Sequence, residues 1–198
     1  MVKSGFWLVA PYALWMVLMA VLPPTAAAYA VRTAAVAALL CVACRRLLAA
    51  HGGRWRPRPA DAGLGVAVGL AVFAIWILPE QFGWMWYGRF FIVGEGGTAA
   101  VAESGAALLA VRLAGSAFVI ALAEELFFRK WLVGFAGFWW MVVLFAVEHD
   151  RWLVGAIAGV IYGWLYLRRG LFAAVVAHAV TNLSLGLWVL KTGQWQFW

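Results

Sequence analysis

Three short motifs in the C-terminal half place polar side chains inside otherwise apolar stretches: EELFFR at 124–129, FAVEH at 145–149 and HAVTN at 178–182. A carboxylate and a histidine together can take a proton from water, and a histidine with an asparagine can donate hydrogen bonds to a developing oxyanion. These are the groups needed to hydrolyse an amide bond without a covalent intermediate. The motifs therefore predict one hydrolytic site, provided that the fold brings them together.

Each motif also has a purely structural interpretation. Glu125 and Arg129 are four residues apart, so on a helix they share a face and can form an ion pair. His178 and Asn182 have the same spacing, and in a membrane such a pair can hold two helices together. An ionisable side chain within a transmembrane helix is costly and is by default a functional-site hypothesis. Three such motifs on three segments favour a shared site.

The distances of the motifs from the expected turns indicate that they can meet. Glu124 lies ten residues before a glycine-flanked turn at 134–137, and His149 lies twelve residues after it. At ~1.5 Å per residue both are roughly 15–18 Å from that turn, and His178, the eighth residue of the last apolar segment, is roughly 12 Å from the same membrane side. We expect one cavity within the bilayer, lined by Glu124, His149, His178 and Asn182. The two histidines should be less than ~12 Å apart.

The composition identifies the kind of molecule that must position these groups. Of the 198 residues 67% are apolar and only 12% are charged, and the mean hydropathy is +0.92. A soluble domain is about half apolar and about a quarter charged, so a water-soluble fold, disorder and a fibrous repeat are excluded. The apolar runs are long and continuous, which also excludes the short alternating strands of a membrane barrel. We expect one all-α integral membrane domain, residues 1–198, with the motifs in a core at 106–190.

Seven apolar segments predict a polytopic transmembrane bundle of about seven helices. They are Phe6–Leu22, Ala26–Leu48, Ala62–Leu78, Ala106–Val133, Phe138–His149, Trp152–Leu167 and Leu171–Leu190. For the motifs to meet, the fourth segment must stay helical through Arg129 and the fifth must end before the far membrane surface. Residues 148–151 would then line a wet cavity, although Arg151 could instead lie at the outer surface. Glycines at four-residue spacing on the third and sixth segments predict close helix packing.

The charges predict the orientation of this bundle. Lys and Arg total 15 against 8 Asp and Glu, which gives a formal charge of +7. Most of the basic residues fall in loops between apolar segments, above all in the loop from Arg45 to Arg58, and the positive-inside rule then places that loop and the N-terminus in the cytoplasm. We expect an uncleaved first helix, with a signal peptide as the alternative. The only other partner expected from this pattern is the lipid bilayer; nucleic acid is excluded, because no polar stretch combines basic and aromatic residues.

Other catalytic chemistries have weaker support. Ser104, Ser116 and Ser184 lie in no nucleophile elbow, and Cys41 and Cys44 fit small membrane-embedded residues better than a redox pair. One carboxylate with two histidines is a catalytic-zinc ligand set, but the HExxH pattern is absent. We therefore expect no cofactor. A divalent metal stays open as the alternative, with the ligands Glu124, His149 and His178.

The three motifs, in this order, resemble the EExxxR, FxxxH and HxxxN signatures of the CPBP family of intramembrane proteases, which includes the CAAX prenyl endopeptidases of the Ras-converting type. The resemblance covers roughly Ala106–Leu190. Within the family, the HDRW that overlaps the end of the second motif and the ending Leu187–Trp198 are similar to a bacterial subgroup described as CAAX prenyl protease-related and linked to exosortase systems. The resemblance implies an integral protein of the bacterial inner membrane.

The resemblance also implies roles for single residues. Glu124 corresponds to the glutamate that activates water and His149 to its histidine partner. His178 and Asn182 correspond to the oxyanion-stabilising pair, and Glu125 and Arg129 support the first motif. The implied activity is cleavage of a membrane-associated protein or peptide, lipidated or sorted by an exosortase. The alternative function is a non-proteolytic membrane partner, such as an immunity (Abi-type) or assembly factor, which keeps the motif cluster for structure.

Overall fold

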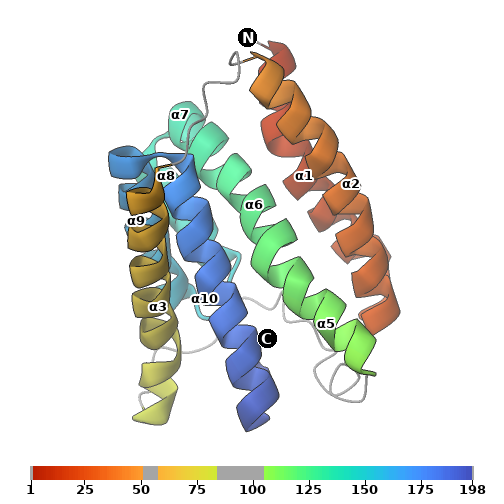
Figure 1. The fold of residues 1–198 in the computed structure, drawn as a ribbon, viewed down its shortest axis with the longest axis vertical. Helices are drawn as coiled ribbons and strands as arrows, with labels where there is room; N and C mark the ends of the chain where they lie inside the picture. Colours follow the sequence, from red (N-terminus) through yellow and green to blue (C-terminus); the bar gives the residue numbers. More distant parts are fainter. Residues whose placement is uncertain (1, 51–57, 84–104, 198) are drawn as a thin grey trace.

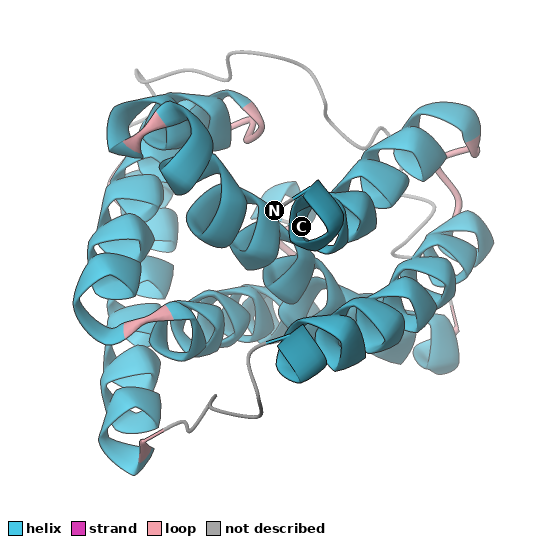
Figure 2. Cartoon of the chain, turned by 90° about the horizontal axis from the view of Figure 1, so that it is seen from above, coloured by secondary structure: helices cyan, strands magenta, loops and turns pink. Residues whose placement is uncertain are grey.

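The computed structural model describes residues 2–50, 58–83 and 105–197, and these residues form seven helical segments and no strand (Figures 1 and 2). The fourth segment is one continuous helix from Ala106 to Ala136 that contains two π-helical stretches. The elements are α1 (Val2–Val21), α2 (Ala26–Ala50), α3 (Pro59–Gln81), α5 (Ala106–Ala114), η2 (Gly115–Ile120), α6 (Ala121–Glu124), η3 (Glu125–Leu132), α7 (Val133–Ala136), α8 (Phe138–Val147), α9 (Trp152–Arg169), α10 (Leu171–Thr192) and the short 3₁₀ turn η4 (Trp195–Phe197). The predicted all-α bundle is confirmed, and each predicted segment corresponds to one helix.

Four of the helices are long and apolar enough to cross a membrane, so the chain is an integral membrane protein. They are Ala26–Ala49, Pro59–Gln81, Ala106–Ala136 and Leu171–Thr192. By contrast, α8 has only 10 residues. A helix of that length is about 15 Å long, half of the roughly 30 Å hydrocarbon core of a bilayer. We therefore expect the turn that follows α8 to lie within the depth of the membrane.

The fifth segment ends two residues earlier than the sequence pattern indicates. His149 lies outside α8, in the turn that leads to α9, and its backbone N–H donates to the carbonyl of Ala146 at 3.1 Å. This bond spans three residues instead of four, so it tightens and ends the last helical turn. The chain then reverses at once, because Gly155 of α9 lets the two backbones approach closely.

Ion pairs at both ends of α3 show that α3 and α9 run in opposite directions. Asp61 at the start of α3 pairs with Arg169 at the end of α9, with 3.7 Å between Oδ1 and Nη1. Glu80 at the end of α3 pairs with Arg151 just before α9. The end of α2 and the starts of α3 and α10 all point toward the upper end of Figure 1. The basic residues near these helix ends therefore lie at one end of the bundle, as the charge pattern predicts.

The helix α10, which carries the third motif, is held against α3 by glycine contacts. A Cβ atom at Gly69 would lie 2.5 Å from the carbonyl oxygen of Ala177, and one at Gly65 would lie 2.9 Å from that of Ala173. Both pairs run in the same chain direction, so α3 and α10 are parallel. Small residues that let backbones approach this closely are typical of membrane helix interfaces. The close contact fixes the height of His178 and Asn182 relative to α3.

Candidate active site

The imidazole of His178 lies between the two carboxylates of the first motif. Its Nδ1 is 2.9 Å from Oε1 of Glu125, and its Nε2 is 3.6 Å from Oε2 of Glu124. All three side chains are buried. Because an ionised carboxylate can only accept, Nδ1 of His178 donates to Glu125. This bond fixes the ring and directs Nε2 toward Glu124.

Arg129 is fully buried beside this triplet. Its Nη1 lies 3.1 Å from Oε1 of Glu125, so the expected ion pair is present. Within the described part of the chain, none of its nitrogens makes a hydrogen bond. Its guanidinium carbon instead lies 4.0 Å from the ring centroid of Phe145, 5.5 Å from that of Tyr162 and 5.8 Å from that of Phe128. One carboxylate and three aromatic rings therefore stabilise the buried cation.

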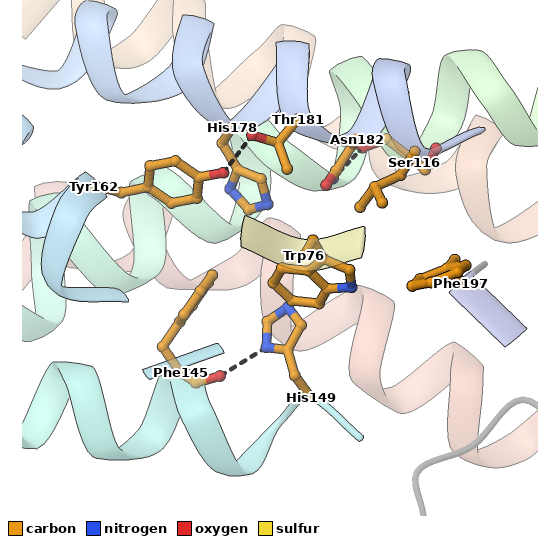
Figure 3. A pocket seen from close by; sticks show the side chains of 10 residues that line it. Trp76, Ser116, Phe145, His149, Tyr162, His178, Thr181, Asn182 and Phe197 are labelled. Carbon is orange, nitrogen blue, oxygen red and sulfur yellow. Dashed lines mark hydrogen bonds between the residues drawn. The ribbon is translucent and has the colours of Figure 1, made fainter. Parts of the chain in front are cut away.

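His149 presents a free nitrogen. Its Nδ1 is 2.7 Å from the backbone carbonyl of Phe145, and because a carbonyl can only accept, Nδ1 carries the hydrogen. The lone pair of the neutral ring is then on Nε2. The ring of Trp76 packs against this imidazole at 5.4 Å and that of Phe145 at 4.6 Å. His149 is thus oriented as a proton acceptor by a backbone bond and two aromatic walls (Figure 3).

The third motif adds an oriented amide on α10. Nδ2 of Asn182 donates to the backbone carbonyl of Ser116 at 2.9 Å, which leaves its second N–H available. One residue earlier, the hydroxyl of Thr181 accepts a hydrogen bond from Tyr162 at 2.6 Å and donates to the carbonyl of Gly69 at 2.8 Å. The ring of Tyr162 stacks on His178, with 5.0 Å between centroids. These bonds tie α9, α10 and α3 together around the two polar side chains (Figure 3).

His149, His178 and Asn182 share one cavity of about 180 Å³. The cavity is lined by Trp76, Ser116, Phe145, His149, Tyr162, His178, Thr181, Asn182, Leu185 and Phe197. The ring of Phe145 lies 4.6 Å from that of His149 and 5.8 Å from that of His178. The separation of the imidazoles cannot exceed the sum of these two distances, so it is below the expected limit of ~12 Å.

Glu124 differs from the expected arrangement, because it does not line this cavity. Its Oε2 lies 3.6 Å from Nε2 of His178, and the carboxylate of Glu148 and the hydroxyl of Tyr12 from α1 are close enough to interact with it electrostatically. From the sequence Glu148, the acidic residue within the second motif, was expected only to line a wet cavity with residues 149–151, and it was assigned no role in the site. In the described residues, Oε2 of Glu124 and Oε2 of Glu148 are both buried without a hydrogen-bond partner. Such orphan atoms mark places where a water or a substrate group binds.

The sequence analysis also missed the apolar walls of the cavity. Trp76 comes from the third segment and Phe197 from the C-terminal end, and neither belongs to a motif. Trp76 is one of 14 Trp and nothing in the sequence singles it out, whereas Phe197 lies in the ending Leu187–Trp198, which carries the subgroup resemblance but was assigned no role in the cavity. Among the described residues, no three His, Cys, Asp or Glu side chains are grouped as metal ligands, and this includes the alternative ligand set.

A glycine on α9 supports the position of His149, and its substitution should weaken activity. A Cβ atom at Gly155 would lie 3.2 Å from the Cβ of His149 and 3.3 Å from the Cα of Ala146. We expect Gly155→Ala to shift His149 by a few tenths of an ångström and to lower turnover, by less than the ~10²-fold that a 1 Å misplacement can cost. Gly63→Ala is the control, because a Cβ there meets nothing within 4 Å. Equal turnover in the two variants would show that the position of His149 is not limiting.

The part of the chain that carries the three motifs is similar to a known protein family. Residues 106–184 match the family model of type II CAAX prenyl endopeptidase Rce1-like proteins. The family resemblance is thereby confirmed over the stretch that carries all three motifs, and it supports, in general terms, the activity of a CAAX-type intramembrane protease. No curated protein and no solved structure matches the chain.

Proposed function

We propose that this protein is an intramembrane endopeptidase, in which Glu124 and His149 activate a water that attacks a peptide bond of a membrane-associated substrate. The observation that carries the proposal is the placement of His178. Its ring contacts the carboxylates of Glu124 and Glu125 and also lines a cavity that contains a second histidine and an asparagine. A structural ion pair would need Glu125 and Arg129 alone, and would leave this cavity without a role.

The proposed reaction follows from the free atoms at the cavity. Nε2 of His149 accepts a hydrogen bond from the attacking water, and the proton of that water passes to Glu124, whose Oε2 lies 3.6 Å from the cavity-lining His178, as the oxygen–carbon bond forms. The free N–H of Asn182 stabilises the oxyanion, and His178, whose Nδ1–H is held by Glu125, adds a second donor when Nε2 is also protonated. The proton on Glu124 then passes to the leaving nitrogen as the carbon–nitrogen bond breaks. Water and peptide are thereby converted to a carboxylic acid and an amine, with no covalent intermediate.

Two measurements test this mechanism directly. Asn182→Ala removes one oxyanion donor and should lower turnover of a membrane-anchored reporter substrate by ~10²–10³-fold. The variant should still fold, because Asn182 is only partly buried and makes one hydrogen bond, to a backbone carbonyl. We propose a metal-free reaction, so a chelator should leave wild-type turnover unchanged. Loss of turnover in chelator without unfolding would support the metal alternative instead.

We also propose that the protein lies in the bacterial inner membrane with its N-terminus in the cytoplasm. The basic ends of α2, α3 and α9 lie at one end of the bundle, and the positive-inside rule places that end in the cytoplasm. Reporter fusions after Arg58 should read cytoplasmic, and fusions near Glu95 should read external. The reverse pattern would invert the protein, and the cavity would then open toward the opposite side.

The depth of the cavity limits the substrate. His149 follows a helix of 10 residues, so a peptide must enter the bilayer to reach it. We propose a membrane-anchored protein or peptide as substrate. A covalent lipid, or a hydrophobic segment of the kind that an exosortase sorts, would hold a scissile bond at this depth.

A further inference from the structure

The chain reverses after α10 and covers the cavity with its own residues. We call residues 193–197 the C-terminal strap. Gly193 has φ of +69°, which ends α10 with a left-handed residue. Oε1 of Gln194 then accepts hydrogen bonds from Trp188 at 3.2 Å and from Gln81 at 3.1 Å. The strap is thereby directed back along α10 and α3.

Phe197 is the residue of the strap that reaches the cavity. Its ring is buried against Ile77 of α3 and against Leu185 and Val189 of α10. It also forms part of the cavity wall, on the side away from Tyr162 (Figure 3). The wall at this position is therefore made by a short terminal segment and not by a transmembrane helix.

Arg151 holds the strap in place. Its Nη2 donates to the backbone carbonyl of Gln196 at 3.3 Å, and its guanidinium carbon lies 4.2 Å from the ring centroid of Phe197. It is paired with Glu80, whose Oε2 accepts a hydrogen bond from the side chain of Gln196 at 3.2 Å. Arg151 is buried, although the sequence also allowed it to lie at the outer surface.

These contacts are those by which a protein binds one residue of a peptide. A guanidinium group holds the backbone carbonyl, and an apolar cluster receives the neighbouring side chain. We propose that Gln196 and Phe197 fill a peptide-binding subsite at the mouth of the cavity, and that a substrate with an aromatic side chain at this position displaces the strap. The substrate part of this inference rests on the proposed protease function, and the opening of the strap does not.

The strap can open because few contacts hold it. The buried cluster of Phe197 has only three other members and is otherwise covered by four partly buried aromatic residues, and two of the side-chain hydrogen bonds that hold the strap, from Gln81 and Gln196, are exposed. Segments with few buried apolar contacts and exposed hydrogen bonds open at low free energy. The helices that line the cavity need not move.

A cysteine in the cavity measures this opening without any turnover. Ser116→Cys places a thiol on the cavity wall, in a background with Cys41→Ala and Cys44→Ala to remove the native thiols. We expect Phe197→Ala to raise the rate of labelling by a water-soluble maleimide at least ~10-fold, which corresponds to about 1.4 kcal/mol of lost closing free energy. Phe135→Ala, which truncates a ring that is 74% exposed, is the matched control and should not change the rate.

A second variant keeps the test decisive. Arg151→Gln removes the contacts with Gln196 and Phe197 while both strap residues remain, and it should also raise the labelling rate. Thermal unfolding in detergent shows whether either variant has lost its fold. Equal labelling of the wild-type, Phe197→Ala and Arg151→Gln proteins, all folded, would overturn the proposal.

The substrate preference is tested in the opened protein. A Gly-Ser peptide amide with one phenylalanine should protect Ser116→Cys from labelling in the Phe197→Ala variant, and the same peptide with glutamine in place of phenylalanine should not. Equal protection by both peptides would overturn the aromatic subsite. Because labelling does not need Glu124, the same measurements in a Glu124→Gln background separate failure of the subsite from failure of the protease function.

Discussion

Glu124→Gln should abolish most of the turnover while leaving the fold intact. The amide keeps the size of the side chain but cannot accept the proton of the attacking water. Loss of a general base typically lowers the rate by ~10²–10⁴-fold. Oε2 of Glu124 makes no hydrogen bond among the described residues, so the substitution breaks none there. The measurement is cleavage of a membrane-anchored reporter in cells, with thermal unfolding of the purified protein in detergent.

Asp150→Asn is the matched control for this experiment. It neutralises a carboxylate in the turn after α8 that, among the described residues, neither lines the cavity nor pairs with His178 as Glu124 does, so turnover should stay near wild type. If Glu124→Gln retained full turnover, the proposed mechanism would fail. If in addition no substrate were cleaved by the wild-type protein, the chain would be better described as a non-proteolytic immunity or assembly factor.

The sequence predicted the parts of this structure that depend on local spacing. The short helix before His149 followed from the length of one short apolar run, and the Glu125–Arg129 pair followed from a four-residue spacing. Both are properties of a single helix or of two helices joined by a short turn. A membrane helix must satisfy its own backbone hydrogen bonds. The pattern of apolar residues therefore predicts its length and the positions of its turns.

The position of the Glu124 side chain relative to His178 could not be predicted from sequence spacing. The counting assumed 3.6 residues per turn, but the chain becomes π-helical at Glu125–Leu132, directly after Glu124. A π-helical stretch changes the rotation between residues, and such stretches occur frequently at functional sites. The direction of each side chain along this helix therefore depends on packing against α1, α8 and α10, which no spacing rule contains.

Contacts between distant segments could not be predicted from the sequence either. Arg151 pairs with Glu80 and holds Gln196, so three segments far apart in the chain meet at the mouth of the cavity. Each of these residues stands near the end of an apolar run, where a solvated charge or amide is the ordinary expectation. Their pairing required the parallel packing of α3 and α10, which is set by contacts at Gly65 and Gly69.

Glu125→Gln should act on stability first, in contrast to Glu124→Gln. Glu125 and Arg129 are both completely buried, and Glu125 is the only carboxylate in ion-pair contact with Arg129 among the described residues. Removing one partner of a buried pair leaves an uncompensated charge and costs ~3–5 kcal/mol. The three aromatic rings around Arg129 offset part of this loss, so we expect the lower end of the range. The measurement is the shift of the unfolding transition in detergent.

A double-mutant cycle separates the lost pair from a general packing defect. Arg129→Met alone should also destabilise the protein, because among the described residues it leaves His178 as the one polar side chain bound to the buried Glu125 carboxylate. The double variant Glu125→Gln/Arg129→Met buries neither charge, so its loss of stability should be smaller than the sum of the two single losses. For residues in contact, the departure from additivity in such a cycle is ~0.5–3 kcal/mol. Additive losses would mean that the two side chains act separately, and the ion pair would then not be what holds the first motif in place.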